Sequence, residues 1–388
     1  MQNFNLGRVP PLSFGAGRLS ELPHVVRALA DGPVLVVADA ILSQLGVLDR
    51  VADRFQAAGI VCEIAADIAG EPKEALIDKL ATQAGTVGAE AIVGIGGGAA
   101  MDAAKLVAAI ARADQPASTF ALSATPLPTN GLPAIAIPTT AGTGSEVTRT
   151  SIVSDARGAK NWYWGEELMF AHAILDPELT LSLPPHLTAW TGIDAVAHAL
   201  EASTARSTNA GGIHYGIEAL KILAEALPRA VAQGDDVQVR SRVLWGSTLA
   251  GLALHNCNTH MGHNISHALG SLSRIHHGLA TGLALEIALP WLVERPEGSA
   301  NYALAAQALG GPARADALPH AFANLMRSCE IPPQLPEECN HVSASALATA
   351  MKSDANFGMS QNAACTIAEL DLDEMAGMMM ALPFSKAA

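Results

Sequence analysis

Up to about residue 180, short apolar runs rich in Val, Ile and Ala alternate with longer runs in which apolar residues recur every three or four positions. This alternation constrains the fold more than any other feature, because strands separated by helices are typical of a mainly parallel sheet with helices on both faces. The clearest strands are expected at Val34–Ala38, Val61–Ala65, Ala91–Ile95 and Ala134–Pro138, and the clearest helices at Ser20–Ala30, Leu48–Ala58, Glu74–Gly85 and Ala99–Ala113. The first part of the chain is therefore predicted to be an α/β domain.

The character of the sequence changes after Leu183-Pro184-Pro185. Apolar residues now recur with a helical period, and the patterns that indicate strands nearly vanish. Helices are expected at Gly211–Leu227, Val237–Leu254, Gly282–Arg295 and Tyr302–Leu309. We therefore place a domain boundary near residue 184, with the α/β domain over residues 1–183 and an all-helical domain over residues 184–388.

A metal site is indicated in the helical domain. The segment Leu187–Ala202 reads as a helix, and a spacing of four residues puts Asp194 and His198 on the same face of it. His263 and His277 follow in a second histidine-rich segment. One carboxylate and three imidazoles suit a divalent ion such as Fe(II) or Zn(II) rather than calcium or magnesium. The alternative is a chance cluster, since the chain has 13 histidines.

A glycine-rich turn between a strand and a helix predicts a phosphate-binding loop. The run Ala91–Ile95 leads into Gly96-Gly97-Gly98, and a helix is expected from Ala99. Glycines let backbone N–H groups approach a phosphate closely, and the positive helix N-terminus favours the anion. A tight turn without a ligand is the alternative reading of this loose G-x-G-x-x-A pattern.

The expected sugar-binding acid precedes this loop, unlike in a standard dinucleotide-binding unit. Asp39 closes the strand Val34–Ala38, where its carboxylate could accept hydrogen bonds from the ribose hydroxyls of NAD. It would repel the 2′-phosphate of NADP, and the next residues offer no arginine, so NAD is favoured over NADP. Alternatively, Asp39 caps a short helix over residues 41–45. A third segment, Ala134–Thr148, carries hydroxyls and glycines that could also bind a nucleotide.

Composition narrows the class of protein. The net charge of −14, without a basic run, argues against a nucleic acid or an anionic membrane as partner. Apolar runs are too short for a membrane span, and the N-terminus lacks the apolar core of a signal peptide. The 5 cysteines are odd in number and form no C-x-x-C pair, which favours reduced thiols in the cytoplasm.

Taken together, these segments resemble the iron-containing, metal-dependent alcohol dehydrogenases of group III over nearly the whole chain. The resemblance is carried by LSFGAG within Pro11–Gly17, GGGAAMDAAK, PTTAGTGSEVT, TGIDAVAHALEA, GHNISHALG with His277-Gly278, and LEIALP. It implies an opening hairpin at Pro11–Gly17 and the two-domain architecture shared with dehydroquinate synthase. It also implies that the metal and the nicotinamide ring meet in a cleft, and that the protein is a homo-oligomer, with a dimer favoured.

The resemblance also implies roles for individual residues. Asp194, His198, His263 and His277 would hold Fe(II), with Zn(II) or another divalent ion as a substitute. His267 would contact the nicotinamide side and relay a proton, or else orient another ligand. The expected cofactor contacts are the diphosphate positions Gly97, Gly98 and Asp102, the nucleotide-side hydroxyls of Thr139, Thr140 and Thr143, and weaker contacts from Lys160 and Leu179.

The chain departs from the family pattern at several places. Ala99 stands where a serine is usual, so one hydroxyl contact to phosphate is missing. Glu71 stands where many members have asparagine, which predicts a displaced loop because an acid near a phosphate is unexpected. The aromatic stretch 161–164 is either a hydrophobic plug between the domains or a wall of the cleft. The late Asn-Pro-Arg signature appears as Asn362-Ala363-Ala364, without the arginine.

The function expected is that of an NAD(H)-dependent, divalent-metal-dependent alcohol dehydrogenase or aldehyde reductase for a small molecule. Thr259 and His260, just ahead of His263, suggest a polar pocket suited to a hydroxylated or acidic substrate, unless they pack against the neighbouring helix. Other possibilities are a hydroxy-acid dehydrogenase or a maleylacetate reductase-like enzyme of the same family, although the latter lacks the metal residues. A dehydroquinate synthase-like lyase would need a basic cluster, and a metal-binding scaffold would need no nucleotide loop.

Overall fold

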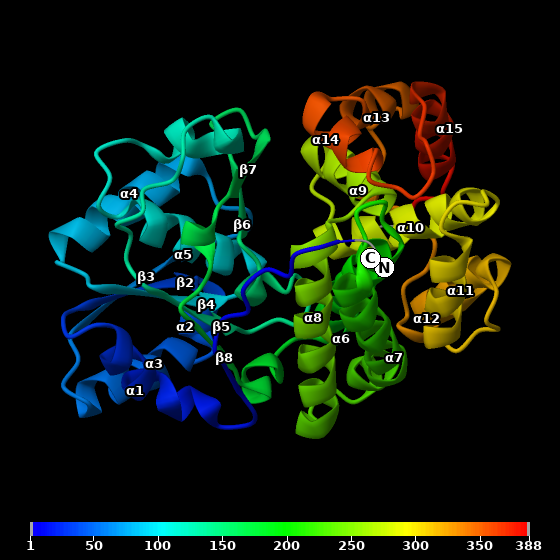
Figure 1. Ribbon diagram of the computed structural model, residues 1–388. Helices are drawn as coiled ribbons and strands as arrows, with labels where there is room; N and C mark the ends of the chain where they lie inside the picture. Colours follow the sequence, from blue (N-terminus) through cyan, green and yellow to red (C-terminus); the bar gives the residue numbers. More distant parts are fainter. Residues whose placement is uncertain (1–2, 386–388) are drawn as a thin grey trace. The chain divides into compact units, whose positions relative to one another are not determined.

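The computed structural model describes residues 3–385, which divide into two compact units (Figure 1). One unit is Arg8–Ser182, and the other starts at Leu183 and takes in the N-terminal segment through Gly7. The division lies next to the boundary expected near residue 184, but residues 3–7 belong with the second half of the chain. Gly7 is held there by a hydrogen bond of 2.8 Å from its N–H to Asn256 Oδ1.

The α/β unit is built on a parallel sheet, as predicted. Within residues 3–385, six strands form this sheet in the order β1-β8-β5-β4-β2-β3, and every neighbouring pair is parallel. The strands are β1 (Leu12–Phe14), β2 (Val34–Asp39), β3 (Cys62–Ile68), β4 (Ala91–Gly96), β5 (Ala134–Pro138) and β8 (His172–Leu175). The prediction of an α/β fold followed by a helical domain is confirmed.

Helices cover both faces of the sheet, which explains why its central strands are almost uninterrupted apolar runs. In Figure 1, α1 and α3 lie on one face and α4 and α5 on the other. Strands β4 and β5 are buried at every residue, as expected for parallel strands between two helical layers. The helices are α1 (Leu22–Leu29), α2 (Ile41–Gln44), α3 (Val47–Ala57), α4 (Glu74–Thr86) and α5 (Gly98–Ile110).

One strand pairing differs from the sequence-based expectation, and a second pairing was not predicted. The hairpin expected at Pro11–Gly17 is wrong, because β1 instead pairs in parallel with β8. The aromatic stretch forms β7 (Lys160–Trp164), which pairs antiparallel with β6 (Thr150–Ser154). Tyr163 of β7 is fully buried inside the α/β unit, and its hydroxyl donates to Glu74 Oε1 at 2.8 Å. This residue therefore anchors the β6–β7 pair to α4.

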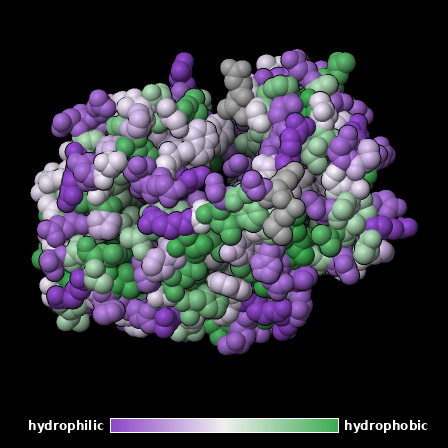
Figure 2. Space-filling model, in the orientation of Figure 1, coloured by the Kyte–Doolittle hydropathy of each residue, from purple (hydrophilic) through white to green (hydrophobic). Residues whose placement is uncertain are grey.

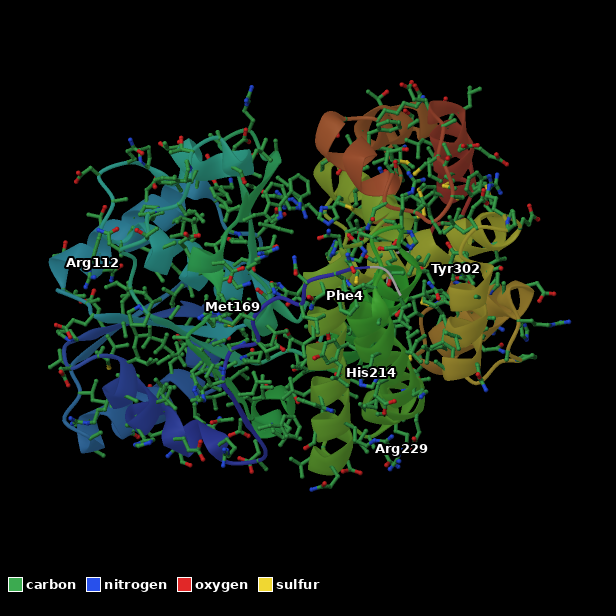
Figure 3. The ribbon with its side chains drawn as sticks, viewed as in Figure 1. Phe4, Arg112, Met169, His214, Arg229 and Tyr302 are labelled. Carbon is green, nitrogen blue, oxygen red and sulfur yellow. The ribbon has the colours of Figure 1, made fainter. Side chains whose placement is uncertain are left out.

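The second unit is helical, and side chains fill the space between its helices (Figure 3). Tyr302, labelled there, is fully buried. The helices are α6 (Pro185–Thr204), α7 (Ala210–Ala232), α8 (Val237–Cys257), α9 (Met261–Leu272), α10 (His277–Val293), α11 (Ser299–Ala308), α12 (Leu318–Ser328), α13 (Ala344–Met351), α14 (Asp354–Ser360) and α15 (Glu369–Met380). Among the described residues, none of the helices combines the length and apolarity needed to cross a bilayer. Hydrophilic and hydrophobic residues are interspersed over the face drawn in Figure 2.

Candidate functional site

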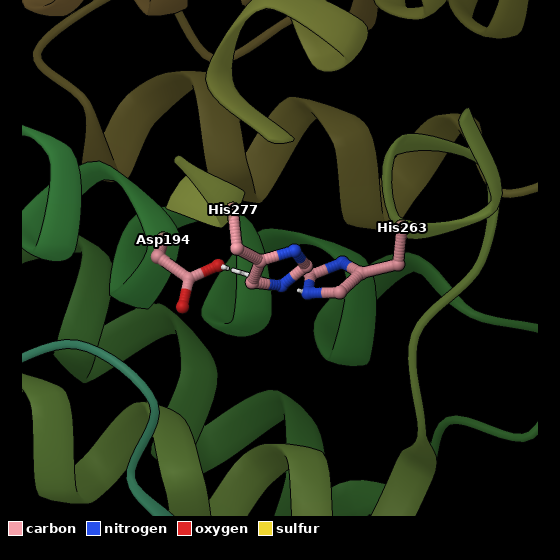
Figure 4. Close-up of side chains that lie close together, drawn as sticks. All are labelled: Asp194, His263 and His277. Carbon is pink, nitrogen blue, oxygen red and sulfur yellow. Dashed lines mark ion pairs between the residues drawn. The ribbon is translucent and has the colours of Figure 1, made fainter. Parts of the chain in front are cut away.

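Three helices of the helical unit bring the predicted metal residues together. Asp194 and His198 lie one turn apart on α6, His263 is on α9, and His277 is the first residue of α10. Asp194 Oδ1 is 3.8 Å from His263 Nε2 and 3.6 Å from His277 Nε2. Figure 4 shows this carboxylate and the two rings directed toward one another. His198 lies beside them, with its Nδ1 3.9 Å from Asp194 Oδ2 and its ring stacked on that of His263 at 4.6 Å.

This donor set fits a divalent transition-metal ion. Three of the residues each offer one ligand atom, and these atoms lie within 4.8 Å of one another: Asp194, His263 and His277. Ligands about 2.1 Å from a tetrahedral ion are separated by roughly 3.4 Å, which is close to the separations observed. Asp194 Oδ1 is buried and accepts no hydrogen bond from the described residues. A buried carboxylate oxygen that faces two imidazoles is well matched to a cation.

Gly278 allows this arrangement. A Cβ atom at position 278 would collide with the carbonyl oxygen of Trp190 on α6 and would lie 3.1 Å from the Cβ of Asp194. The start of α10 can therefore lie against α6 only if residue 278 has no side chain. This close approach places His277 beside Asp194.

We expect Gly278→Ala to weaken metal binding at least about tenfold and to lower stability by roughly 1–3 kcal/mol, because the new methyl group must push α10 away from α6. Chelator competition would measure the first effect and thermal unfolding the second. Gly270→Ala is the matched control, since an added Cβ at Gly270 on α9 meets nothing within 4 Å. Metal affinity in Gly278→Ala equal to that of Gly270→Ala would contradict this role.

Behind the predicted ligands lies a buried acid to which sequence reasoning gave no role. Glu201 is fully buried on α6, and its Oε2 is 2.5 Å from His263 Nδ1. Its Oε1 accepts the Gly262 N–H at 2.5 Å and lies 3.3 Å from His260 Nδ1. Burial alone would raise the pKa of Glu201, but the charges of His260 and His263 and hydrogen bonds from His263 and the His260 backbone lower it to about 2. The carboxylate lies on the side of His263 opposite the predicted metal site, and nitrogen atoms of Gly262, His260 and His263 face its two oxygens.

His267 lies beside two of the predicted metal ligands. It is buried on α9, and its ring meets the ring of His277 edge-on, with a centroid distance of 5.0 Å. The centroid of the His263 ring is 6.0 Å away. His267 therefore packs against two of the predicted ligands, and its contact with a nicotinamide stays a prediction.

In the α/β unit, the glycine loop and Asp39 form one structure. The Gly97 N–H donates to Asp39 Oδ2 at 2.7 Å, where β2 and β4 end side by side. Burial raises the pKa of Asp39, and the Gly97 N–H lowers it in part. Gly96 has φ +149°, and a side chain there would collide with the Asp39 carboxylate. Asp39 does not cap α2, whose N-cap is Ala40, so the alternative role as a cap is wrong.

Two of the predicted threonines lie against this loop. A Cβ at Gly97 would be 3.5 Å from Thr140 Oγ1, and a Cβ at Gly98 would be 2.6 Å from Thr143 Cγ2. Thr139 begins the same segment, and its N–H donates to the Gly96 carbonyl at 2.8 Å. The structure thus brings together Asp39, Gly97, Gly98, Thr139, Thr140 and Thr143 at the carboxyl edge of the sheet. This edge is where open α/β sheets bind ligands.

Asp102 lies below the loop, where protein groups occupy both of its oxygens. Oδ1 accepts from the Ser145 hydroxyl at 2.6 Å, and Oδ2 accepts from the Ile152 N–H at 2.9 Å. Lys105, also buried, donates to Ser145 Oγ at 2.8 Å and to the Thr150 carbonyl at 2.8 Å. Burial lowers the pKa of Lys105 to about 8, although Asp102 and Glu146 oppose this. Asp102 and Lys105 thus hold the segment after Thr143 in place, and direct contact of Asp102 with a diphosphate stays a prediction.

The remaining two predicted cofactor residues differ in their surroundings. Lys160 Nζ forms an ion pair with Glu71 Oε2 at 3.4 Å, and Ser154 Oγ donates to Glu71 Oε1 at 2.8 Å. The acid that was unexpected at position 71 is therefore neutralised locally. Leu179 is buried in the hydrophobic core of the α/β unit, so its side chain contributes packing.

Comparison with known proteins identifies the family to which the chain belongs. The N-terminal model of the iron-containing alcohol dehydrogenases matches residues 10–177, and the C-terminal model of that family matches residues 188–368. The chain is 35% identical over 286 residues to long-chain-alcohol dehydrogenase 1 of Geobacillus thermodenitrificans, covering 73% of this chain and 72% of the relative. The chain belongs to the iron-containing alcohol dehydrogenase family.

Other members of the family extend this match. Sulfoacetaldehyde reductase of Bilophila wadsworthia is 31% identical over 313 residues, covering 79% of each protein. The crystal structure of sulfoacetaldehyde reductase from Bifidobacterium kashiwanohense with NAD⁺ superposes with a TM-score of 0.88 at 27% identity, covering 98% of this chain and 100% of the other. As a member of this family, the protein is an oxidoreductase that acts on alcohols.

The structure shows the surroundings of two family positions that sequence reasoning described only in part. The polar pocket expected from Thr259 and His260 is not supported, because His260 is fully buried between Glu201 and Thr204, with its Nε2 3.0 Å from Thr204 Oγ1. Asn362, which retains the first position of the Asn-Pro-Arg signature, has a structural role. Its Nδ2 donates to the Cys257 and Thr259 carbonyls at 3.1 and 3.0 Å.

The Glu71–Lys160 pair predicts an effect on the cofactor. Burial raises the pKa of Asp102 on α5, and the nearby charge of Glu71 adds to this increase. We expect Glu71→Gln to strengthen NADH binding about threefold, because it removes a negative charge near the predicted diphosphate loop and frees the Lys160 ammonium group. Fluorescence titration with NADH would measure this. Glu166→Gln, which removes an exposed partner of Arg149, is the control. Weaker NADH binding by Glu71→Gln would contradict the expectation.

Proposed function

We propose that this member of the family is an NAD(H)-dependent, divalent-metal-dependent alcohol dehydrogenase and aldehyde reductase. Asp194, His198, His263 and His277 would hold the ion, with Fe(II) as the preferred metal and Zn(II) as a substitute. The observation that carries this proposal is the buried Asp194 Oδ1 facing two imidazole Nε2 atoms. Support for NAD comes from the glycine loop joined to Asp39 and from the NAD⁺ complex of the related reductase.

Different residues of the chain have different proposed roles in the reaction. When bound, the divalent ion supplies Lewis-acid polarisation of the substrate oxygen, and the nicotinamide supplies or accepts the hydride. Gly97 and Gly98 would hold the diphosphate with backbone N–H groups at the start of α5. Asp39 would accept hydrogen bonds from the ribose hydroxyls, and an imidazole nitrogen of His267 would hold the proton exchanged with the alcohol.

The substrate class is proposed only as a primary alcohol or its aldehyde. The relatives are named for substrates as different as a long-chain alcohol and sulfoacetaldehyde. With His260 buried, the sequence-based reason for an acidic substrate no longer holds. The decisive experiment is a screen of short, long, hydroxylated and sulfonated aldehydes, following NADH and NADPH oxidation by absorbance. Turnover of none of them would contradict the proposed substrate class.

We also propose that the protein is a cytoplasmic homodimer. The five cysteines are all free, which suits a reducing compartment. The dimer rests on resemblance to the family. Light scattering coupled to size-exclusion chromatography would test the oligomeric state.

Cofactor choice can be tested at Asp39. Asp39→Asn keeps an oxygen that can accept the Gly97 N–H but removes the charge that would repel a 2′-phosphate. We expect the ratio of kcat/KM for NADPH to that for NADH to rise about tenfold or more, since like charges ~4 Å apart repel by a few kcal/mol. Asp39→Gly is a harsher variant because it also loses the bond to Gly97. A ratio unchanged in Asp39→Asn, or a wild-type preference for NADPH, would refute the role of Asp39.

A further inference from the structure

The Glu201 carboxylate determines which ring nitrogen of His263, a predicted metal ligand, carries the proton. The Gly262 N–H donates to Glu201 Oε1, and a carboxylate surrounded by nitrogen donors in this way accepts hydrogen bonds through both oxygens. The 2.5 Å contact between Glu201 Oε2 and His263 Nδ1 therefore places the ring proton on Nδ1. The other nitrogen, Nε2, then carries a lone pair, and it is this atom that lies 3.8 Å from Asp194 Oδ1. His263 is thus held as a donor toward the predicted ion.

Glu201 itself is held in one orientation from two sides. Its Oε1 accepts the Gly262 N–H at 2.5 Å, and His260 Nδ1 lies 3.3 Å from the same oxygen. Beyond His260, Thr204 Oγ1 is 3.0 Å from His260 Nε2. A side chain at Gly262 would come 2.7 Å from Leu285 Cγ on α10 and 3.1 Å from Glu201 Oε1 on α6, so the glycine lets α9 approach both helices closely. A fully buried carboxylate needs such partners, because an unpaired buried charge is costly.

We propose that Glu201 is a positioning residue for metal binding: it locks His263 in the Nδ1–H form with Nε2 presented to the ion, and His260 and Gly262 hold it in that orientation. This inference rests on the proposed metal dependence of the enzyme. Helix periodicity makes it possible, because Glu201 lies seven residues after Asp194 on α6 and therefore near the same face. One face of α6 thus supplies two predicted ligands and the group that orients a third.

Glu201→Gln tests the proposal with little change of shape. The amide oxygen would accept the Gly262 N–H, which leaves the amide NH₂ facing His263 Nδ1. An NH₂ group can only donate, so His263 would shift its proton to Nε2, the atom that must bind the metal. We expect the affinity for Zn(II) or Co(II), measured by competition with a chromophoric chelator, to fall about ten- to hundredfold. NADH binding should not change.

The matched control is Glu218→Gln, which alters an exposed acid on α7 that forms an ion pair with nearby Lys221. It should bind metal like the wild type. Affinity in folded Glu201→Gln within twofold of that control would overturn the proposal. A wild-type protein that binds neither ion would instead overturn the proposed metal dependence, which keeps the two failures distinct.

A measurement on the wild-type protein covers the case in which Glu201→Gln does not fold. ¹⁵N chemical shifts of the metal-free protein distinguish protonated from bare imidazole nitrogens. We expect His263 to carry its proton on Nδ1, with Nε2 bare. A His263 ring protonated on Nε2 alone would refute the proposal without any substitution.

Discussion

Replacing His263 by alanine should remove both bound metal and turnover, while NADH binding stays within about twofold of wild type. The Nε2 of this residue is one of two imidazole nitrogens that face Asp194 Oδ1. Polarisation of the substrate oxygen by a metal is worth several kcal/mol, so turnover should fall about a thousandfold or more. Metal analysis, steady-state kinetics and NADH titration on the same preparation would measure the three quantities.

His214→Ala is the matched control, since His214 is an exposed histidine on α7 of the same unit. It should keep metal and activity. Asp194→Asn offers a second test, because it keeps the shape of the side chain and removes the charge. Turnover at the wild-type rate by metal-free His263→Ala would exclude any mechanism that depends on this metal site.

Gly97→Val should weaken NADH binding about a hundredfold, or by roughly 2.8 kcal/mol. The backbone at Gly97 has φ −80°, which any residue can adopt, and an added Cβ would make only ordinary contacts of 3.5 Å with Thr140. The variant should therefore fold. Its branched side chain would occupy the space in which a diphosphate must approach the N–H groups that begin α5.

Fluorescence titration with NADH and a thermal melt would separate binding from stability in this variant. Gly85→Val is the control, since Gly85 on α4 has open space around it. Metal content should not change in either variant. If folded Gly97→Val bound NADH as tightly as Gly85→Val, the diphosphate would have to bind elsewhere.

The elements of the α/β unit were predictable because their signals are local. The run Ala134–Ile137 is apolar at every position, and it forms a strand buried on both faces. The pairing of β1 was not predictable, because its partner β8 lies about 160 residues later and the turn-like LSFGAG suggests a hairpin. The position of the first residues depends likewise on a distant contact, between Gly7 and Asn256.

Sequence spacing alone predicted part of the metal site. Asp194 and His198 are four apart on one helix, and His263 and His277 follow in a second histidine-rich segment, but the sequence alone does not show that the two segments meet in space. Glu201 was overlooked because an acid in a helix usually faces solvent. Its spacing from Asp194 was the available signal, since seven residues return to the same face. The buried positions of Asp102 and His260 could not be read from sequence, because they depend on how helices and loops pack.

The most direct test of the account is metal reconstitution of chelator-treated wild-type protein under anaerobic conditions. Fe(II), Zn(II) or magnesium would be added back stepwise, and aldehyde-dependent NADH oxidation would be compared with bound metal and with NADH affinity. We predict that turnover rises in proportion to bound Fe(II), reaches a plateau at about one ion per chain, and does not respond to magnesium, while NADH affinity stays constant throughout. Full turnover by the metal-free protein, or a plateau reached with magnesium alone, would contradict the account.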